Sequence, residues 1–296
     1  MIAMTIAETG SAATRLRRRF ALRGYIPLVP PITFLMIFFA VPIGMMIGIS
    51  FQDSKTLAFS LGSYERVFTD DLILAGIFRT MVMSGLVAIC VTVMAYPVAY
   101  FLARSTSRWR TVVFALAIAP ELAGVVLRTY GWLIILEDRG FINDALIWLG
   151  VISSPLPLAK NLFGVVVGLT HVVLPFGILA LLTSIQGIDP NIEKAAQILG
   201  ASRASVIRHI LLPLSIPGIV SSLLISFTMA ASAYATPALL GGARFKVLAT
   251  MIYEQIMFYI NWPLAAVMAI VMLVMMLAIS FAGARIETRL HKKLNV

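Results

Sequence analysis

The stretch Asp189–Pro213 reads DPNIEKAAQILGASRASVIRHILLP and is the longest amphipathic segment of the chain. Asp189 followed by Pro190 predicts a helix start, because an N-cap acceptor precedes a residue that has no N–H to satisfy. Gly200 is placed to end this helix, and Ser202 to cap the next one. Apolar residues recur between these ends at helical spacing, namely Ile192, Ala195, Ala196 and Leu199. The pattern predicts a short helix that lies exposed between two membrane spans, in a position suited to contact with a partner.

The composition is that of an integral membrane protein. Of 296 residues, 60% are hydrophobic and 12% are charged, whereas soluble domains average about 25% charged residues. The single cysteine, Cys90, excludes a disulfide framework or a cysteine-based metal site, and the three histidines are too far apart for an HExxH zinc motif. No metal site is therefore expected. The chain also has no GxxxxGK[ST] phosphate loop, so it does not hydrolyse ATP by that route.

Six apolar runs are long enough to cross a bilayer, which requires about 20 residues. They cover residues 25–50, 77–103, 111–136, 162–185, 211–234 and 263–284. The predicted fold is therefore an all-α integral membrane protein with six transmembrane helices. An even number of spans places both termini on the same side of the membrane.

The distribution of basic residues predicts which side that is. Fifteen of the 23 Lys and Arg residues fall on the side of the termini, seven on the other, and Arg128 lies within a span. By the positive-inside rule, the basic segment 1–24, the stretch 189–210 and the tail 285–296 are cytoplasmic. The net charge of +10 is thus an orientation signal, and nucleic acid is not an expected partner.

The connections on the opposite side carry further elements. Residues 51–76 predict a short helix around Ser63–Phe68, and residues 137–161 predict a helix at the membrane interface, anchored by Trp148. Residues 235–262 contain a Gly-Gly turn followed by an amphipathic stretch.

Charged residues inside the membrane are costly and so are candidates for function. Glu121 and Arg128 share a face of the third predicted span, but about two helical turns separate them, so a direct pair is not expected. They either line a polar pathway or pair with other spans. For His171 a packing hydrogen bond is favoured over contact with a solute. The candidate pathway residues are Glu121, Arg128, Tyr130, Trp132, His171 and Tyr234.

The spacing of Ala195-Ala196, Gly200 and Ile210-x-Leu212-Pro213 resembles the EAA motif of permease subunits in bacterial type I ABC importers. One position departs from the motif, because Lys194 stands where the motif has glutamate and an acid, Glu193, comes just before it. The resemblance implies that this helix is a coupling helix, which docks on a cytoplasmic ATPase. The residues it implicates are Glu193, Lys194, Ala195, Ala196, Leu199, Gly200, Ala201, Ile210 and Pro213.

Four other stretches resemble spermidine and putrescine permeases: Tyr96–Arg104, Val126–Leu136, Leu174–Pro190 and Pro237–Gly242. The resemblance implies a permease domain over 76–284 in the bacterial inner membrane. It implies partners as well: an ABC ATPase dimer that binds ATP and Mg, a second homologous permease, a periplasmic solute-binding protein and membrane lipid. It assigns no cofactor and no catalytic residue to this chain.

Two alternatives stay open. The permease could serve an opine, an aminophosphonate, ferric ion or another small solute instead of a polyamine. A stand-alone secondary transporter or channel is a function of another class, although no inverted repeat is visible and intramembrane charge is scarce.

Overall fold

The computed structural model describes residues 26–294, and the predicted basic segment 1–24 lies outside these residues. Apart from one isolated β-bridge between Gln52 and Phe59, the regular structure of this part is helical. The helices are η1 (Ile26–Leu28), α2 (Val29–Leu35), η2 (Met36–Ala40), α3 (Val41–Ser50), α4 (Gly62–Thr69), α5 (Asp71–Arg104), α6 (Trp109–Ile118), η3 (Ala119–Leu122), α7 (Val125–Leu136), α8 (Phe141–Trp148), α9 (Leu162–Gln186), α10 (Pro190–Ile198), α11 (Arg203–Val206), η4 (Ile207–Leu211), α12 (Leu212–Leu214), α13 (Ile216–Ser232), α14 (Ala235–Leu240), α15 (Leu248–Met257) and α16 (Trp262–Leu294).

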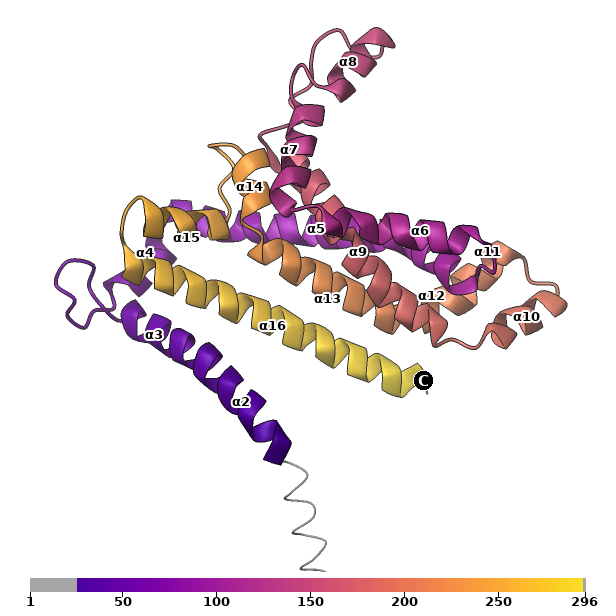
Figure 1. The fold of residues 1–296 in the computed structure, drawn as a ribbon, viewed down its shortest axis with the longest axis horizontal. Coiled ribbons are helices and arrows are strands. Elements are labelled where there is room, and N and C mark those ends of the chain that lie inside the picture. Colours follow the sequence, from indigo (N-terminus) through magenta and orange to yellow (C-terminus); the bar gives the residue numbers. More distant parts are fainter. Residues whose placement is uncertain (1–25, 295–296) are drawn as a thin grey trace, which may run out of the picture.

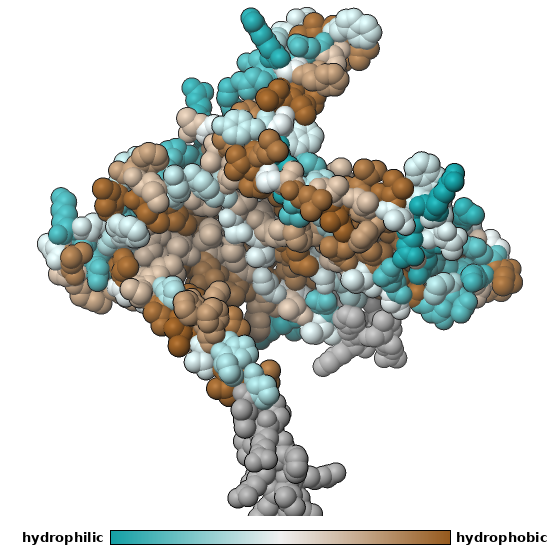
Figure 2. Space-filling model, viewed as in Figure 1, coloured by the Kyte–Doolittle hydropathy of each residue, from teal (hydrophilic) through white to brown (hydrophobic). Residues whose placement is uncertain are grey.

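The long helices lie side by side and define two ends of the molecule (Figure 1). Helix α5 packs against α9 and α13, α16 packs against α13, and α3 packs against α16. Helix α10 lies at one end of this bundle, where α5 and α9 finish, and α4 and α15 lie at the other end. Apolar residues cover much of the side of the bundle, and hydrophilic residues gather around α10 (Figure 2).

Small residues allow the central helices to approach closely, as is usual between membrane helices. A Cβ atom added to Gly218 of α13 would lie 2.2 Å from the Cβ of Ser184 in α9. Between α5 and α13, the hydroxyls of Thr92 and Ser222 are hydrogen-bonded at 3.0 Å. The buried core of α5 and α9 includes fully buried Val87 and Leu181. Close backbone packing and a buried hydroxyl pair therefore fix the centre of the bundle.

Four helical segments are long and apolar enough to cross a membrane: Val29–Ser50, Asp71–Arg104, Leu162–Gln186 and Trp262–Arg289. Two more spans are possible if each of two bent helix pairs counts as one, which gives up to six among the described residues. In the most apolar part of the first segment, Val29–Ser50, none of the residues is buried by the rest of the chain. Its π-helical turn, Met36–Ala40, ends two residues before Pro42, whose ring cannot fit a regular α-helical ladder.

The predicted spans over 111–136 and 211–234 are sharply bent in the structure, near prolines that interrupt these apolar runs. The first breaks after η3, so that Trp109–Leu122 and Val125–Trp148 meet at 99°. The second bends by 66° between Arg203–Leu214 and Ile216–Ser232. Pro120 lies in η3, just before the first break, and Pro213 and Pro217 flank the second, where missing N–H donors and ring clashes interrupt the helix.

Beyond the first break, α7 and α8 project from the side of the bundle as an arm (Figure 1). The helix expected within 137–161 is α8, and Trp148 at its end is 85% exposed. The helix expected around Ser63–Phe68 is α4, and the amphipathic stretch after the Gly-Gly turn is α15. Helix α14, which precedes that turn, was not predicted.

Candidate functional site

Helix α10 is held in place by the end of α5. The Nε atom of Arg104 donates a hydrogen bond to Oε1 of Glu193 at 2.6 Å, and Nη2 of Arg104 donates to the carbonyl of Ile188 at 2.9 Å. The side chains of Arg104 and Glu193 are only 15% and 9% exposed. Asp189 caps α10 as predicted, because its side chain accepts from the N–H of Asn191 at 2.9 Å. A buried ion pair of this kind fixes the position of the helix relative to the bundle.

The opposite face of α10 is apolar and exposed. Ile192, Ile198 and Leu199 are 43%, 85% and 88% exposed, and Lys194 and Ala195 are exposed with them. Exposed large apolar residues grouped at one tip are unusual on a monomer surface and mark contact sites. We refer to Ile192, Ile198 and Leu199 as the apolar tip.

The underside of α10 rests on a small core of Ile188, Val206 and Leu211. Ala196 and Ala201 pack against this core, together with Ile210. Pro213 follows in α12, directly before the 66° bend. The predicted coupling residues therefore form two groups. Lys194, Ala195 and Leu199 lie on the exposed surface of α10, whereas Ala196, Ala201 and Ile210 pack against the core beneath it.

Gly200 ends α10 as predicted. Its φ of +90° is a conformation that side chains disfavour, and the turn is closed by a hydrogen bond from the N–H of Ala201 to the carbonyl of Ala196 at 3.0 Å. Ser202 caps α11, accepting from the N–H of Ser205 at 3.2 Å. The chain thus reverses sharply, and Ile198 and Leu199 of the apolar tip stand next to the point of reversal.

The structure separates the roles of Glu193 and Lys194. Glu193 points inward to Arg104, so it does not supply an acid at the exposed surface in place of the motif's glutamate. Lys194 is exposed. Sequence reasoning missed the part played by Arg104, which it treated only as an orientation charge. Its place as the last residue of the stretch Tyr96–Arg104, shared with the permeases, was the available signal.

The second set of candidates lies where α7 leaves the bundle. Contrary to expectation, Glu121 and Arg128 pair directly, with Arg128 Nη1 3.0 Å from Glu121 Oε2. The two-turn separation assumed one continuous helix, whereas the break at 123–124 folds η3 back towards α7. The Arg128 side chain is 7% exposed, and its Nε atom has no hydrogen-bond partner among the described residues.

Trp132 lies one turn after Arg128, on the same face of α7. Its Nε1 donates to Nδ1 of His171 in α9 at 3.1 Å, which confirms a packing hydrogen bond for His171. On another side of α7, the hydroxyls of Thr129 and Thr236 are 3.0 Å apart, joining α7 to α14. Two polar contacts therefore fix the base of the projecting arm.

The two tyrosine candidates are exposed. Tyr130 is 49% exposed on α7, and Tyr234 is 38% exposed between α13 and α14. The ring of Tyr234 lies tilted against that of Tyr253, with the ring centroids 4.5 Å apart, and sequence reasoning did not single out Tyr253. Exposed aromatic rings of this kind attract cations through their faces. Within residues 26–294, no three His, Cys, Asp or Glu side chains group in a way that could hold a metal ion.

A family model matches residues 97–292, and it describes the binding-protein-dependent transport system inner membrane component. The match begins in the last turns of α5, runs to α16 and includes α10. The chain belongs to this family. It is a permease subunit of an ABC importer in the inner membrane, and this membership excludes the alternative of a stand-alone secondary transporter or channel.

The family assignment agrees with similarity to single proteins. The spermidine/putrescine transport system permease protein PotB of Escherichia coli (strain K12) is 30% identical over 274 residues, covering 91% of this chain and 99% of PotB. A solved bacterial ABC transporter that imports the acidic polysaccharide alginate aligns with a TM-score of 0.74 at 20% identity, over 93% of this chain and 98% of its own. A chain of the MetNI methionine ABC transporter aligns with a TM-score of 0.58 at 20% identity, over 74% of this chain and 96% of its own. These solved structures show the fold.

Proposed function

We propose that this permease binds a cytoplasmic ABC ATPase through the apolar tip of α10. The observation that carries the proposal is the contrast between the two faces of this helix. One face is anchored by the Arg104–Glu193 pair, and the other exposes Ile198 and Leu199 almost fully. An anchored helix with an apolar tip transmits force between a partner and the bundle, which a loosely held loop does not do.

The ATPase supplies the chemistry and this chain supplies the movement. ATP and Mg are bound by the partner, since the chain itself contains no GxxxxGK[ST] sequence. Closure of an ATPase dimer moves α10, and the Arg104–Glu193 pair passes the movement to α5, which spans the bundle. The result is alternating access by rigid-body motion, with a second permease subunit forming the other half of the pathway.

This role sets the orientation. The basic segment 1–24, α10 and the tail 285–296 face the cytoplasm, and α4, α15 and the loops beside them face the other side, where a periplasmic binding protein delivers the solute. The excess of Lys and Arg at the α10 side supports this arrangement. So does the complex of the alginate transporter with its pentasaccharide-bound periplasmic protein, a solved structure of the same fold.

For the solute we propose a polyamine such as spermidine or putrescine. The support is the similarity to PotB over nearly the whole of both chains. The exposed rings of Tyr130, Tyr234 and Tyr253 suit an ammonium group. Glu121 contributes less than its charge suggests, because Arg128 already neutralises it.

The experiment is reconstitution of the importer with its ATPase, its sister permease and its binding protein in nanodiscs. The proposal predicts a stable complex whose ATPase activity rises when spermidine or putrescine is added with the binding protein. Stimulation only by an opine, an aminophosphonate or ferric ion would contradict the proposal of a polyamine solute but would leave the permease role intact. Absence of any bound ATPase would contradict the docking role of α10.

A further inference from the structure

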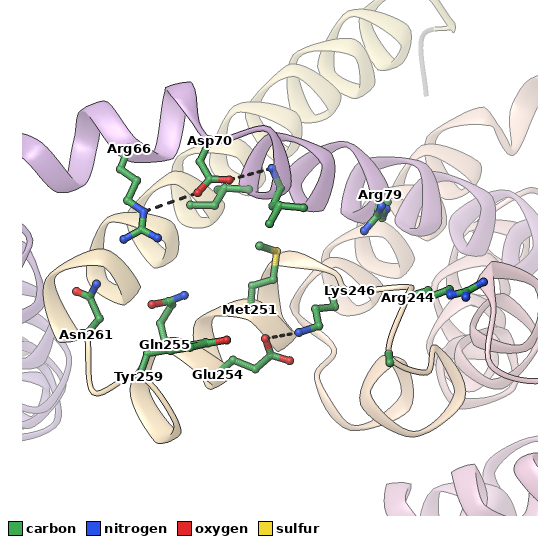
Figure 3. A pocket seen from close by; sticks show the side chains of 13 residues that line it. Arg66, Asp70, Arg79, Arg244, Lys246, Met251, Glu254, Gln255, Tyr259 and Asn261 are labelled. Atoms are coloured by element: carbon green, nitrogen blue, oxygen red, sulfur yellow. Dashed lines mark hydrogen bonds and ion pairs between the residues drawn. The ribbon is translucent and has the colours of Figure 1, made fainter.

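A cavity of about 830 Å³ opens at the end of the bundle opposite α10 (Figure 3). It lies between the junction of α4 with α5 and the segment that leads into α15. Its charged lining residues are Arg66, Asp70, Arg79, Arg244, Lys246 and Glu254. We refer to this site as the outer basic cavity.

Both acids in the outer basic cavity already have basic partners. Asp70 lies 3.7 Å from Arg66, and its other oxygen caps α5 by accepting from the N–H of Leu72 at 2.9 Å. Glu254 accepts a hydrogen bond from Lys246 Nζ at 2.7 Å. These carboxylates are therefore occupied, and they leave two of the four cations uncompensated.

Those two cations are Arg79 and Arg244, which have no carboxylate within 4.0 Å among the described residues. Arg79 is half-buried on α5, and Arg244 is exposed on the rim. A guanidinium presents a planar fork that matches a carboxylate or phosphate, so the free pair favours an anion. The same excess of positive charge repels ammonium groups, which makes the cavity unsuitable as a station for a cationic solute.

The two helices that wall the cavity, α5 and α15, are joined closely beside Arg79. Next to Arg79, the hydroxyl of Thr80 accepts a hydrogen bond from the N–H of Leu248 at 2.8 Å, which joins α5 to α15. Gly76 lets α15 come still closer, because a Cβ there would lie 2.4 Å from Sδ of Met251. A cavity whose walls need no rearrangement binds its partner at a lower entropic cost.

We propose that the outer basic cavity receives acidic side chains of the solute-binding protein. This inference rests on the proposed function, which places this end of the bundle outside the cytoplasm. The family is binding-protein-dependent, so a protein partner is expected there. Exposed Tyr259 adds an aromatic ring to the arginines of the rim, and tyrosine and arginine are the residues that most often anchor protein interfaces. A lipid phosphate has similar chemistry, but sites for anionic lipids are expected on the cytoplasmic side.

The test measures the Kd of fluorescently labelled binding protein for the complete importer in phosphatidylcholine nanodiscs. Arg244→Glu should raise the Kd about tenfold and weaken its dependence on salt, because it removes an attraction and adds a repulsion. Arg79→Gln should raise it less. Lys55→Glu is the matched control, since Lys55 is exposed at the same end and does not line the cavity, and its Kd should stay within about twofold of the unmodified value.

A binding-protein variant with one acid changed to arginine should restore tight binding to Arg244→Glu, which would identify the paired residue. The inference is overturned if both arginine variants elute as intact complexes and bind like the unmodified importer. It is also overturned if they lose only a dependence of ATPase activity on phosphatidylglycerol, because that result indicates a lipid site. If the unmodified importer itself fails to bind the protein, the proposed function fails first.

Discussion

Arg104 and Glu193 form a hydrogen-bonded ion pair at 2.6 Å that joins the last turn of α5 to the first turn of α10. Eighty-nine residues separate them in the chain. Because α5 runs the length of the bundle, a force applied to α10 reaches the opposite end through this contact. The pair is therefore the mechanical link on which the proposed coupling depends.

Arg104→Ala should uncouple the importer. The substitution leaves the Glu193 carboxylate buried without a partner, and breaking a buried pair in this way destabilises by about 3–5 kcal/mol. We expect the binding-protein-stimulated ATPase activity to fall at least tenfold and the thermal midpoint of the purified complex to drop. Arg104→Lys is the control, since it keeps the charge but loses the fork that reaches both Glu193 and Ile188. It should retain an intermediate activity, and full activity in Arg104→Ala would contradict the link.

Replacing Ile198 and Leu199 together by serine should release the ATPase. Both side chains are more than four-fifths exposed, so the change removes apolar contact area with a partner and leaves the core of this chain intact. Co-purification measures the outcome, and the variant should insert in the membrane normally while losing the ATPase. Leu57→Ser, at an exposed leucine in the outer loop, should retain it. Equal retention in both would exclude the apolar tip as the contact.

Gly200→Asp and Ala196→Arg should both abolish transport-coupled ATPase activity without loss of membrane insertion. At Gly200 a Cβ would meet no atom within 4 Å, so the effect comes from the backbone φ of +90°, which costs an ordinary residue about 1–2 kcal/mol, and from a new charge beside Ile198 and Leu199. Gly200→Asn is the matched control, because asparagine and aspartate both tolerate positive φ but only aspartate adds a charge, so it should keep more activity than Gly200→Asp. Ala196 is half-buried and packs against the core below α10, so an Arg there would disturb this contact and add a charge. Normal coupling in either main variant would contradict the docking role.

Arg128→Ala should reduce uptake strongly, because Glu121 then keeps a charge without its partner at the break before α7. Exchanging the two residues, Glu121→Arg with Arg128→Glu, restores opposite charges and should recover part of the uptake. Radiolabelled putrescine accumulation in cells provides the measurement. If Arg128→Ala transports normally, the pair has no part in the pathway or in its shape.

Gly218→Ala should destabilise the bundle by about 1–3 kcal/mol, the usual effect of overpacking a tight contact. The added methyl group would lie 2.2 Å from Cβ of Ser184. Ser184→Gly removes the atoms it meets, so the double variant should regain thermal stability. A double variant as unstable as Gly218→Ala would show that the strain lies elsewhere.

The sequence allowed the helical class, most spans and the limits of α10 to be predicted, because these depend on local signals. Apolar run length defines spans, and Asp189, Pro190 and Gly200 act within one or two residues of themselves. Prolines mark the bends near 123–124 and Ser215, but the sequence does not predict their angles of 99° and 66°, since proline inside an apolar run is equally compatible with a mildly kinked helix.

The pairs that build the candidate site depend on the fold rather than on spacing. Arg104 with Glu193 and Trp132 with His171 come from helices far apart in the chain. Even the short-range pair Glu121 with Arg128 was misjudged, because its distance depends on the 99° bend. The type of each residue indicated that it is a candidate for the site, but only the packing of the helices shows which side chains pair with each other.

Photo-crosslinking from the apolar tip tests the central claim most directly. A benzoylphenylalanine placed at position 199 reports which protein lies against α10 in the assembled importer. We predict an adduct with the ATP-binding subunit from this position and none from position 57 at the opposite end. A purified complex that contains the ATPase but gives no adduct from position 199, or equal adducts from both positions, would contradict the account.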